Sequence, residues 1–163
     1  MQLLSCPTGS ADWSGLHNTL AQDPDGHVSI FHGLEPREIA HLVEMSPVIT
    51  CAPGDRIINQ DSAERSVFVV LEGAVEVVRD GHHVALMTRG GVFGEVAFLL
   101  GGERTADVVA ATEAKVISLR ERVLNDLIAS ESKIAARFLL NLARIVSLKL
   151  ADDTDVPPAR PAQ

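Results

Sequence analysis

The stretch that most constrains the fold is a glycine-rich loop near the middle of the chain. Glycine pairs at residues 90–91 and 101–102 bracket the apolar residues 96–100, with Glu95 before them and Arg104 after them. Glycine allows positive φ and lets the backbone approach a ligand closely. A short helical turn beginning at Glu95 would direct N–H groups and the positive end of its dipole toward an anion. The pattern therefore predicts a tight loop that forms a pocket for negative charge.

The acid and the base of this loop suggest what such a ligand carries. The planar guanidinium of Arg104 can donate to two oxygens of a phosphate at once. Glu95 can accept a hydrogen bond from a hydroxyl of the same ligand. A 3′,5′-cyclic nucleotide has one phosphate charge and one free sugar hydroxyl, so it suits both side chains. The alternative is that Glu95 and Arg104 form only a structural ion pair.

The stretch Phe93-Gly94-Glu95-Val96-Ala97, followed by Arg104-Thr105-Ala106, resembles the phosphate-binding cassette of the cyclic nucleotide-binding domain family. The resemblance implies a β-roll sensor in which Glu95 binds the ribose 2′-hydroxyl and Arg104 binds the cyclic phosphate, helped by the N–H groups of Ala97 and Thr105. The matching residues, which are the candidate ligand-binding residues, are Phe93, Gly94, Glu95, Val96, Ala97, Arg104, Thr105 and Ala106.

The identity of the nucleotide depends on weaker signals. Thr105 stands where cGMP-selective members of the family use a threonine, but cAMP binders also carry Thr or Ser there. Because bacterial-type rolls mostly use cAMP, we expect cAMP as the ligand, with cGMP as the alternative.

Residues 47–119 have the pattern of a β-domain. Short runs rich in Val and Ile are separated by Gly, Pro and Asp turn signals, which is typical of a sandwich or roll. Residues 66–71 read as a buried strand, and residues 74–78 read as its hairpin partner after Gly73. With the resemblance, the expected fold is mainly β: an eight-stranded, jelly-roll-like β-roll with N-terminal helices, a short cassette helix and two C-terminal helices.

Two residues depart from the family pattern. Asp61 stands where many members have glycine, but Asp tolerates left-handed backbone better than most residues. Glu103 stands where proline is common and places a second carboxylate next to Arg104, where it would compete for the guanidinium.

Helical periodicity flanks the roll on both sides. Before it, apolar residues between 30 and 43 recur at helical spacing, with Pro36 in the first turn and Glu35 as a weak N-cap. After it, we predict one helix over residues 120–129 and a second over about 131–150, with Ser130 as its N-cap.

The second of these C-terminal helices is apolar over a wider sector than one core contact requires. The resemblance implies that this helix moves on ligand binding and covers the base, with Phe138, Leu139 and Leu142 as open candidates for the cap. The sector also leaves room for contact with a second copy or another protein.

The composition excludes several other functions. The 163 residues are 46% hydrophobic, which is enough for one domain with a core, and the net charge of −8 without a basic run disfavours a nucleic-acid surface. Two cysteines are too few for a disulfide framework or a zinc site, and no apolar run approaches membrane-spanning length. Because His82 and His83 are adjacent on a strand and point to opposite faces, a cupin-type metal site is disfavoured. We expect a cytoplasmic protein that is not an enzyme.

The chain is thus divided into a 1–29 extension, a 30–150 cyclic nucleotide-binding domain (roll 47–119, helices 120–150) and a disordered 151–163 tail. The extension contains a short helix-like piece around Trp13, Leu16 and Leu20. Bacterial regulators built on this roll usually continue into a helix-turn-helix of several tens of residues. Only about a dozen residues follow the last predicted helix of this sequence, so we expect no DNA binding by this chain itself. The predicted function is a cyclic nucleotide sensor that signals through its last helix. The alternative is an interaction or dimerisation module that no longer binds nucleotide.

Overall fold

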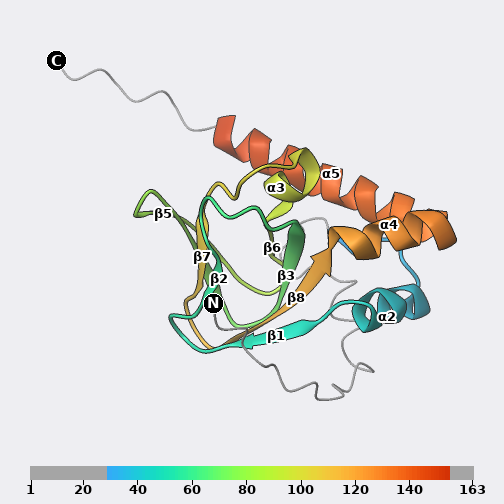
Figure 1. Cartoon of the computed structure of the whole chain (residues 1–163), viewed down its shortest axis with the longest axis horizontal. Coiled ribbons are helices and arrows are strands. Elements are labelled where there is room, and N and C mark those ends of the chain that lie inside the picture. The colour runs from blue at the N-terminus through green and yellow to red at the C-terminus, as the bar shows by residue number, and fades with distance from the viewer. Residues whose placement is uncertain (1–28, 155–163) are drawn as a thin grey trace.

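The computed structural model describes residues 29–154, which form a β-roll with helices before, within and after it (Figure 1). The predicted helix-like piece in the N-terminal extension lies outside the described residues. The elements are α2 (Pro36–Glu44), β1 (Val48–Cys51), β2 (Arg56–Ile58), β3 (Ser66–Glu72), β4 (Val75–Arg79), β5 (His82–Met87), β6 (Val92–Phe93), α3 (Glu95–Leu100), β7 (Asp107–Ala110), β8 (Ala114–Arg120), α4 (Glu121–Ser130) and α5 (Ser132–Thr154).

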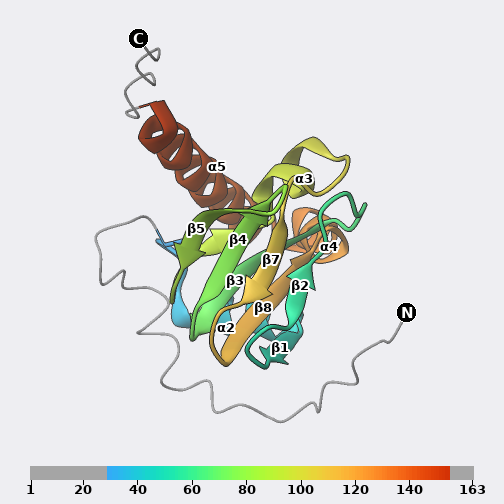
Figure 2. The ribbon, with the colours of Figure 1, turned by 90° about the vertical axis from the view of Figure 1, so that its left-hand side faces the viewer.

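The eight strands in this part of the chain form two four-stranded sheets. Their orders are β1-β8-β3-β6 and β2-β7-β4-β5, and every pairing between neighbours is antiparallel. Figure 2 shows the strands of the second sheet across the front of the roll, with α3 and α5 at the same end of it. The predicted fold class, a β-roll with a short cassette helix and two C-terminal helices, is confirmed.

The predicted hairpin between residues 66–71 and 74–78 is wrong. Strands β3 and β4 follow each other in the chain but belong to different sheets. The chain crosses between the sheets at Gly73, whose φ is 77° and where a Cβ would lie 2.1 Å from the carbonyl oxygen of Glu113. The backbone of Ala74 is hydrogen-bonded to Ala111 and Thr112. The β7–β8 turn therefore holds the crossing, and residues that far along the sequence leave no local signal at Gly73.

Two apolar clusters make up the core. One lies inside the roll and includes Phe68, Phe93 and Val116. The other joins the roll to the helices and includes Ile39, Leu127 and Phe138. Because strand β3 alternates between the two clusters, nearly all of its residues are buried, which explains its unbroken apolar sequence.

The starts of the helices correct two details of the prediction. Glu35 is the N-cap of α2, and its N–H donates to Glu38 Oε2 at 2.7 Å, so the helix start is completed by a carboxylate one turn later. Ser130 does not cap α5. It is the last residue of α4, and its hydroxyl donates to the carbonyl of Asp126.

Helix α5 runs to Thr154, four residues past the predicted end, because the acidic residues after Leu150 do not stop a helix as proline does. Its buried Asn141 donates to the carbonyls of Ile30 and His32 at 3.0 and 2.8 Å, which ties α5 to the segment before α2. Within residues 29–154, no helix combines the length and apolar character needed to cross a bilayer.

Candidate functional site

The glycine-rich loop folds as a strand, a left-handed residue and a short helix. Gly94 has φ 78° and lies between β6 and α3, the helix that begins at Glu95. A Cβ at Gly94 would lie 2.6 Å from Arg104 Nη1 and 2.9 Å from the carbonyl oxygen of Ser66. Glycine is therefore required at position 94 for two reasons: its positive φ and the close approach of the guanidinium.

Arg104 is buried beneath this loop, with 2% of its surface exposed. Its Nη1 donates to the carbonyl of Gly94 and its Nη2 to the carbonyl of Ser66, both at 2.8 Å. The guanidinium carbon lies 5.7 Å from the centroid of the Phe68 ring, which itself stacks on Phe93 at 5.2 Å. Carbonyl dipoles and an aromatic face thus stabilise the cation.

The charge of Arg104 is only partly compensated. Burial lowers the pKa of the guanidinium, and the nearby carboxylates of Glu64 and Glu95 offset only part of this lowering. Arg104 forms no ion pair with a carboxylate of the described residues, and its buried Nε–H has no hydrogen-bond partner there. A buried cation with an unused donor is costly. The side chain is therefore suited to an anion that accepts from Nε.

Glu95 is paired with a different residue, so the structural Glu95–Arg104 ion pair considered from the sequence is not formed. Its Oε1 accepts from Lys149 Nζ of α5 at 2.7 Å, and the Glu95 side chain is 9% exposed. Lys149 Nζ also donates to the carbonyl of Val92 at 2.6 Å. The C-terminal part of α5 therefore reaches the cassette and binds the carboxylate expected to hold a ribose hydroxyl.

The loop between β2 and β3 holds the backbone of Arg104. The N–H of Asp61 donates to the carbonyl of Arg104, and the N–H of Arg104 donates to the carbonyl of Ser62, both at 2.8 Å. Asp61 has φ 65°, a left-handed conformation that Asp tolerates better than most residues. The backbone N–H of Gln60 fixes the loop, because it donates to Asp107 Oδ1 at 2.7 Å.

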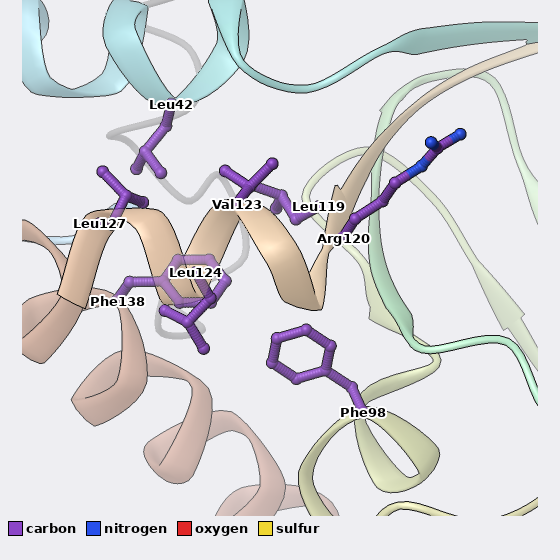
Figure 3. Close-up of a pocket in the computed structure, with 8 residues that line it drawn as sticks. All are labelled: Leu42, Phe98, Leu119, Arg120, Val123, Leu124, Leu127 and Phe138. Atoms are coloured by element: carbon purple, nitrogen blue, oxygen red, sulfur yellow. The ribbon is translucent and has the colours of Figure 1, made fainter. Parts of the chain in front are cut away.

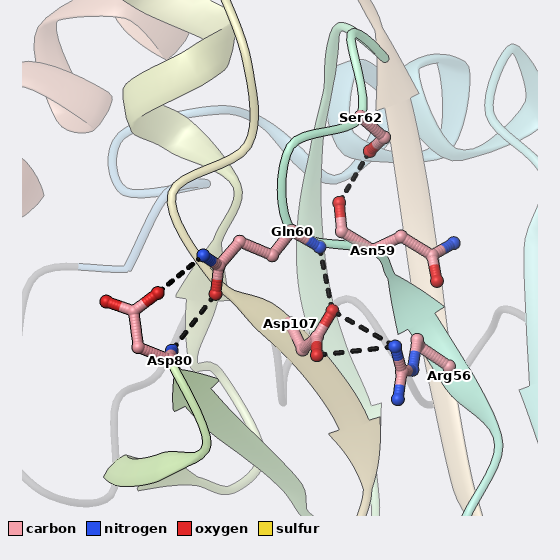
Figure 4. A network of polar contacts seen from close by, with 6 residues as sticks. All are labelled: Arg56, Asn59, Gln60, Ser62, Asp80 and Asp107. Carbon is pink, nitrogen blue, oxygen red and sulfur yellow. Dashed lines mark hydrogen bonds and ion pairs between the residues drawn. The ribbon is translucent and has the colours of Figure 1, made fainter.

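The side chain of Gln60 joins this loop to the β4–β5 turn (Figure 4). Its Nε2 donates to Asp80 Oδ1 at 2.8 Å, and its Oε1 accepts from the N–H of Asp80. Arg56 completes the network through an ion pair with Asp107. The position of Arg104 is thus set by a polar network that runs across the second sheet, from β2 over β7 to the β4–β5 turn.

A small apolar pocket lies where α3 meets the helices (Figure 3). Phe98 of the cassette helix projects into it, opposite side chains of α4 and Phe138 of α5. The lining residues are Leu42, Phe98, Leu119, Arg120, Val123, Leu124, Leu127 and Phe138. Because neither Glu95 nor Arg104 lines it, this pocket connects the cassette to the helices and is not the predicted ligand site.

The three candidates for the base cap lie in different environments. Phe138 and Leu142 are buried in the cluster between roll and helices, and Leu139 is half-buried. Contact with a base would require Phe138 or Leu142 to leave the core, so Leu139 is the most accessible candidate in this arrangement.

The remaining candidate residues of the cassette differ in how far they are exposed to solvent. Ala97 and Ala106 are buried, whereas Val96 and Thr105 are exposed, and the carbonyl of Thr105 accepts from Arg79 Nε at 3.2 Å. Glu103, expected to compete for the guanidinium, is exposed, and the carboxylates that act on the pKa of Arg104 are Glu64 and Glu95.

The paired histidines do not share one partner. His83 Nδ1 lies 2.7 Å from Glu76 Oε1 across the β4–β5 pair, which fits side chains that leave the strand on opposite faces. Among residues 29–154, no cluster of three or more His, Cys, Asp or Glu side chains is arranged to hold a metal ion.

Lys149 is the site residue that the sequence prediction missed. Its signal is the helical period: it follows Leu142 and Ile145 by seven and four residues, on the face that packs on the roll. A lysine on a buried helix face indicates a carboxylate partner.

Known proteins resemble the chain over most of its length. The cyclic nucleotide-gated channel beta-3 of Mus musculus is 28% identical over 140 residues, which cover 82% of this chain and 20% of the channel subunit. The CRP-like cAMP-activated global transcriptional regulator of Mycobacterium tuberculosis is 28% identical over 138 residues, 78% of this chain and 62% of the regulator. The chain thus spans less than two thirds of each of these relatives.

Solved structures share the fold. The catabolite activator protein of Thermus thermophilus has a TM-score of 0.67 at 27% identity, over 77% of this chain and 59% of that protein. A cyclic nucleotide-binding domain from Methylobacillus flagellatus has a TM-score of 0.76 at 18% identity, over 83% and 80%. The sequence profile of the family described as "Cyclic nucleotide-binding domain" matches residues 48–131, more than half of the chain. This chain belongs to the cyclic nucleotide-binding domain family.

Proposed function

We propose that the chain is a cyclic nucleotide sensor that binds cAMP in the cassette and passes occupancy on through α5, without catalysing a reaction. The observation that carries the proposal is the state of Arg104. This cation is almost completely buried, forms no ion pair with the described carboxylates and has an unpartnered Nε–H. A phosphate oxygen would supply both the missing charge and the missing acceptor.

In this proposal Glu95 and Arg104 recognise different parts of the ligand. Arg104 binds the cyclic phosphate, and Glu95, buried at the first position of α3, accepts the ribose 2′-hydroxyl. Gly94 links the two residues, because it directly precedes Glu95 and its carbonyl accepts from Arg104 Nη1. The backbone N–H groups of Ala97 and Thr105 are the proposed additional donors.

We propose cAMP rather than cGMP as the ligand. The support is that one regulator with 28% identity over 78% of this chain is described as cAMP-activated. The exposed Thr105 is the position at which a guanine-selective hydroxyl contact would form.

Transmission through α5 is supported by two contacts of the cassette helix. Phe98 of α3 projects into the apolar pocket that Phe138 of α5 also lines, and Glu95 is bound to Lys149. A shift of α3 would therefore act on both halves of α5. The exposed Leu140, Leu148 and Leu150 give α5 an apolar surface for a second copy or another protein.

Calorimetric titration of cAMP and cGMP into the purified chain tests the proposal. Arg104→Lys keeps the positive charge but loses the planar fork, and Arg37→Lys, at a residue whose side chain is 82% exposed on α2, is the matched control. We expect micromolar or tighter binding of cAMP by the wild type and the control, weaker binding of cGMP, and at least a tenfold loss in Arg104→Lys, about 1.4 kcal/mol.

A thermal melt provides a second readout, since ligand at about 1,000 times its Kd should add about 4 kcal/mol of stability. If the wild type, freed of any co-purified nucleotide by unfolding and refolding, binds neither nucleotide, the proposal is overturned. The chain would then be an interaction module built on the same roll.

A further inference from the structure

We propose that Lys149 is an internal competitor for the ribose-hydroxyl position, so that a nucleotide must displace the end of α5 to reach Glu95. This inference rests on the proposed function and adds a regulatory contact to the same site. It starts from an observation that the cassette motif does not contain: the carboxylate of Glu95 is bound to an amine from the last helix.

The contact has the geometry of a specific polar anchor. Lys149 Nζ is 2.7 Å from Glu95 Oε1 and 2.6 Å from the carbonyl oxygen of Val92, so two of its three donors are used on the cassette strand and helix. The side chain of Lys149 is 35% exposed and that of Glu95 is 9% exposed. Lys149 is therefore the more exposed partner of a largely buried carboxylate, and its amine occupies Oε1 of the group that the proposed ribose hydroxyl would bind.

The position of Lys149 follows from the packing of α5. Phe138, Leu142, Ile145 and Lys149 succeed one another at intervals of four, three and four residues, so they share one helix face. The first two are fully buried and Ile145 packs at the margin of the core. Along this face the contact with the roll therefore changes from apolar to polar and ends on the cassette.

The polar contact matters for holding the end of α5 because apolar burial declines there. Leu148 and Leu150, on either side of Lys149, are 44% and 62% exposed. Charge-assisted hydrogen bonds to a largely buried carboxylate and a backbone carbonyl are stronger than neutral ones. We conclude that Lys149 is a main attachment of the C-terminal turns of α5 to the roll.

Competition at Glu95 would link occupancy to this attachment. A ribose hydroxyl that takes the carboxylate releases Lys149, and a held Lys149 weakens nucleotide binding by the same free energy. The released element is the last part of α5, which carries the exposed Leu148 and Leu150. Release of Lys149 thus gives the sensor an output at the C-terminal end of α5.

The test compares Lys149→Met with Lys133→Met, which removes an exposed lysine near the start of the same helix. Calorimetry with cAMP is expected to show about tenfold tighter binding for Lys149→Met, because loss of one partly exposed charge-assisted contact corresponds to roughly one factor of ten. Lys133→Met should bind as the wild type does. Unchanged or weaker binding by Lys149→Met overturns the competition, whereas no binding by any of the proteins overturns the proposed function instead.

Hydrogen exchange tests independently whether cAMP releases the end of α5. This test can be carried out on the wild type alone if Lys149→Met fails to fold. Saturating cAMP should speed amide exchange in residues 146–152 of the wild type by at least tenfold while slowing exchange in residues 92–106. In Lys149→Met the fast exchange of residues 146–152 should be present before cAMP is added. Slower exchange of residues 146–152 on cAMP addition would show that this end of α5 closes on the ligand, and would overturn the proposal.

Discussion

Substitution of Gly94 by alanine should damage the site through Arg104. Gly94 has φ 78°, and its new Cβ would lie 2.6 Å from Arg104 Nη1 and 2.9 Å from the carbonyl oxygen of Ser66. The backbone of Ser66 cannot move easily, because Ser66 belongs to β3, an inner strand of the first sheet. The guanidinium must therefore move, and its hydrogen bonds to the carbonyls of Gly94 and Ser66 are strained or lost.

Gly54→Ala is the matched control. Gly54 also has positive φ, 90°, but a Cβ there would meet nothing within 4 Å. Both variants should lose about 1–2 kcal/mol of unfolding free energy for the left-handed backbone. Gly94→Ala should lose a further 1–3 kcal/mol, roughly, for disrupted hydrogen bonds of a buried charged group.

Chemical unfolding followed by far-UV circular dichroism measures the difference between the two variants. For a chain of this size 1 kcal/mol corresponds to about 2–4 °C in Tm, so a melt should separate them by several degrees. Gly94→Ala should also lose cAMP binding, and Gly54→Ala should keep it. Equal destabilisation of the two variants would refute the argument that Gly94 makes room for Arg104.

Two further substitutions test the frame around the site. Asn141→Leu should destabilise the fold by about 1–3 kcal/mol in urea unfolding, because it leaves the buried carbonyl of Ile30 and the more exposed carbonyl of His32 without their donor; an unchanged midpoint would contradict this. Asp61→Val should cost about 2 kcal/mol, since a β-branched residue is strained at φ 65°, whereas Asp61→Gly should be at least as stable as the wild type; a stable valine variant would mean that the loop takes another conformation.

The sequence patterns were sufficient to predict those features that depend on nearby residues, namely the cassette loop and the two C-terminal helices. The glycine spacing of the cassette predicted the turn and helix after Gly94, and the change from strand to helical periodicity located α4 and α5 to within a few residues. The positive φ of Asp61 was also predictable, because the side chain and the turn position are both local.

What the sequence did not predict depends on partners far along the chain. The crossing at Gly73 is held by the β7–β8 turn, and Lys149 is 54 residues from Glu95. Ser130 has the right side chain for a cap, but the preceding helix includes it and its hydroxyl bonds within that helix. Tertiary contacts thus decide the arrangement at Gly73 and at Lys149, whereas Ser130 is decided by a hydrogen bond within its own helix.

We propose that a phosphate oxygen of the ligand accepts from the buried Nε–H of Arg104, which has no hydrogen-bond partner within residues 29–154. A ¹⁵N–¹H spectrum that resolves arginine Nε–H groups, assigned by the peak missing in Arg104→Lys, tests this claim during a cAMP titration. We expect the Arg104 Nε–H resonance to move strongly downfield and to saturate with the calorimetric Kd, while that of the exposed Arg37 stays in place. If cAMP binds and the Arg104 resonance does not move, the phosphate is bound elsewhere and Arg104 is not its ligand.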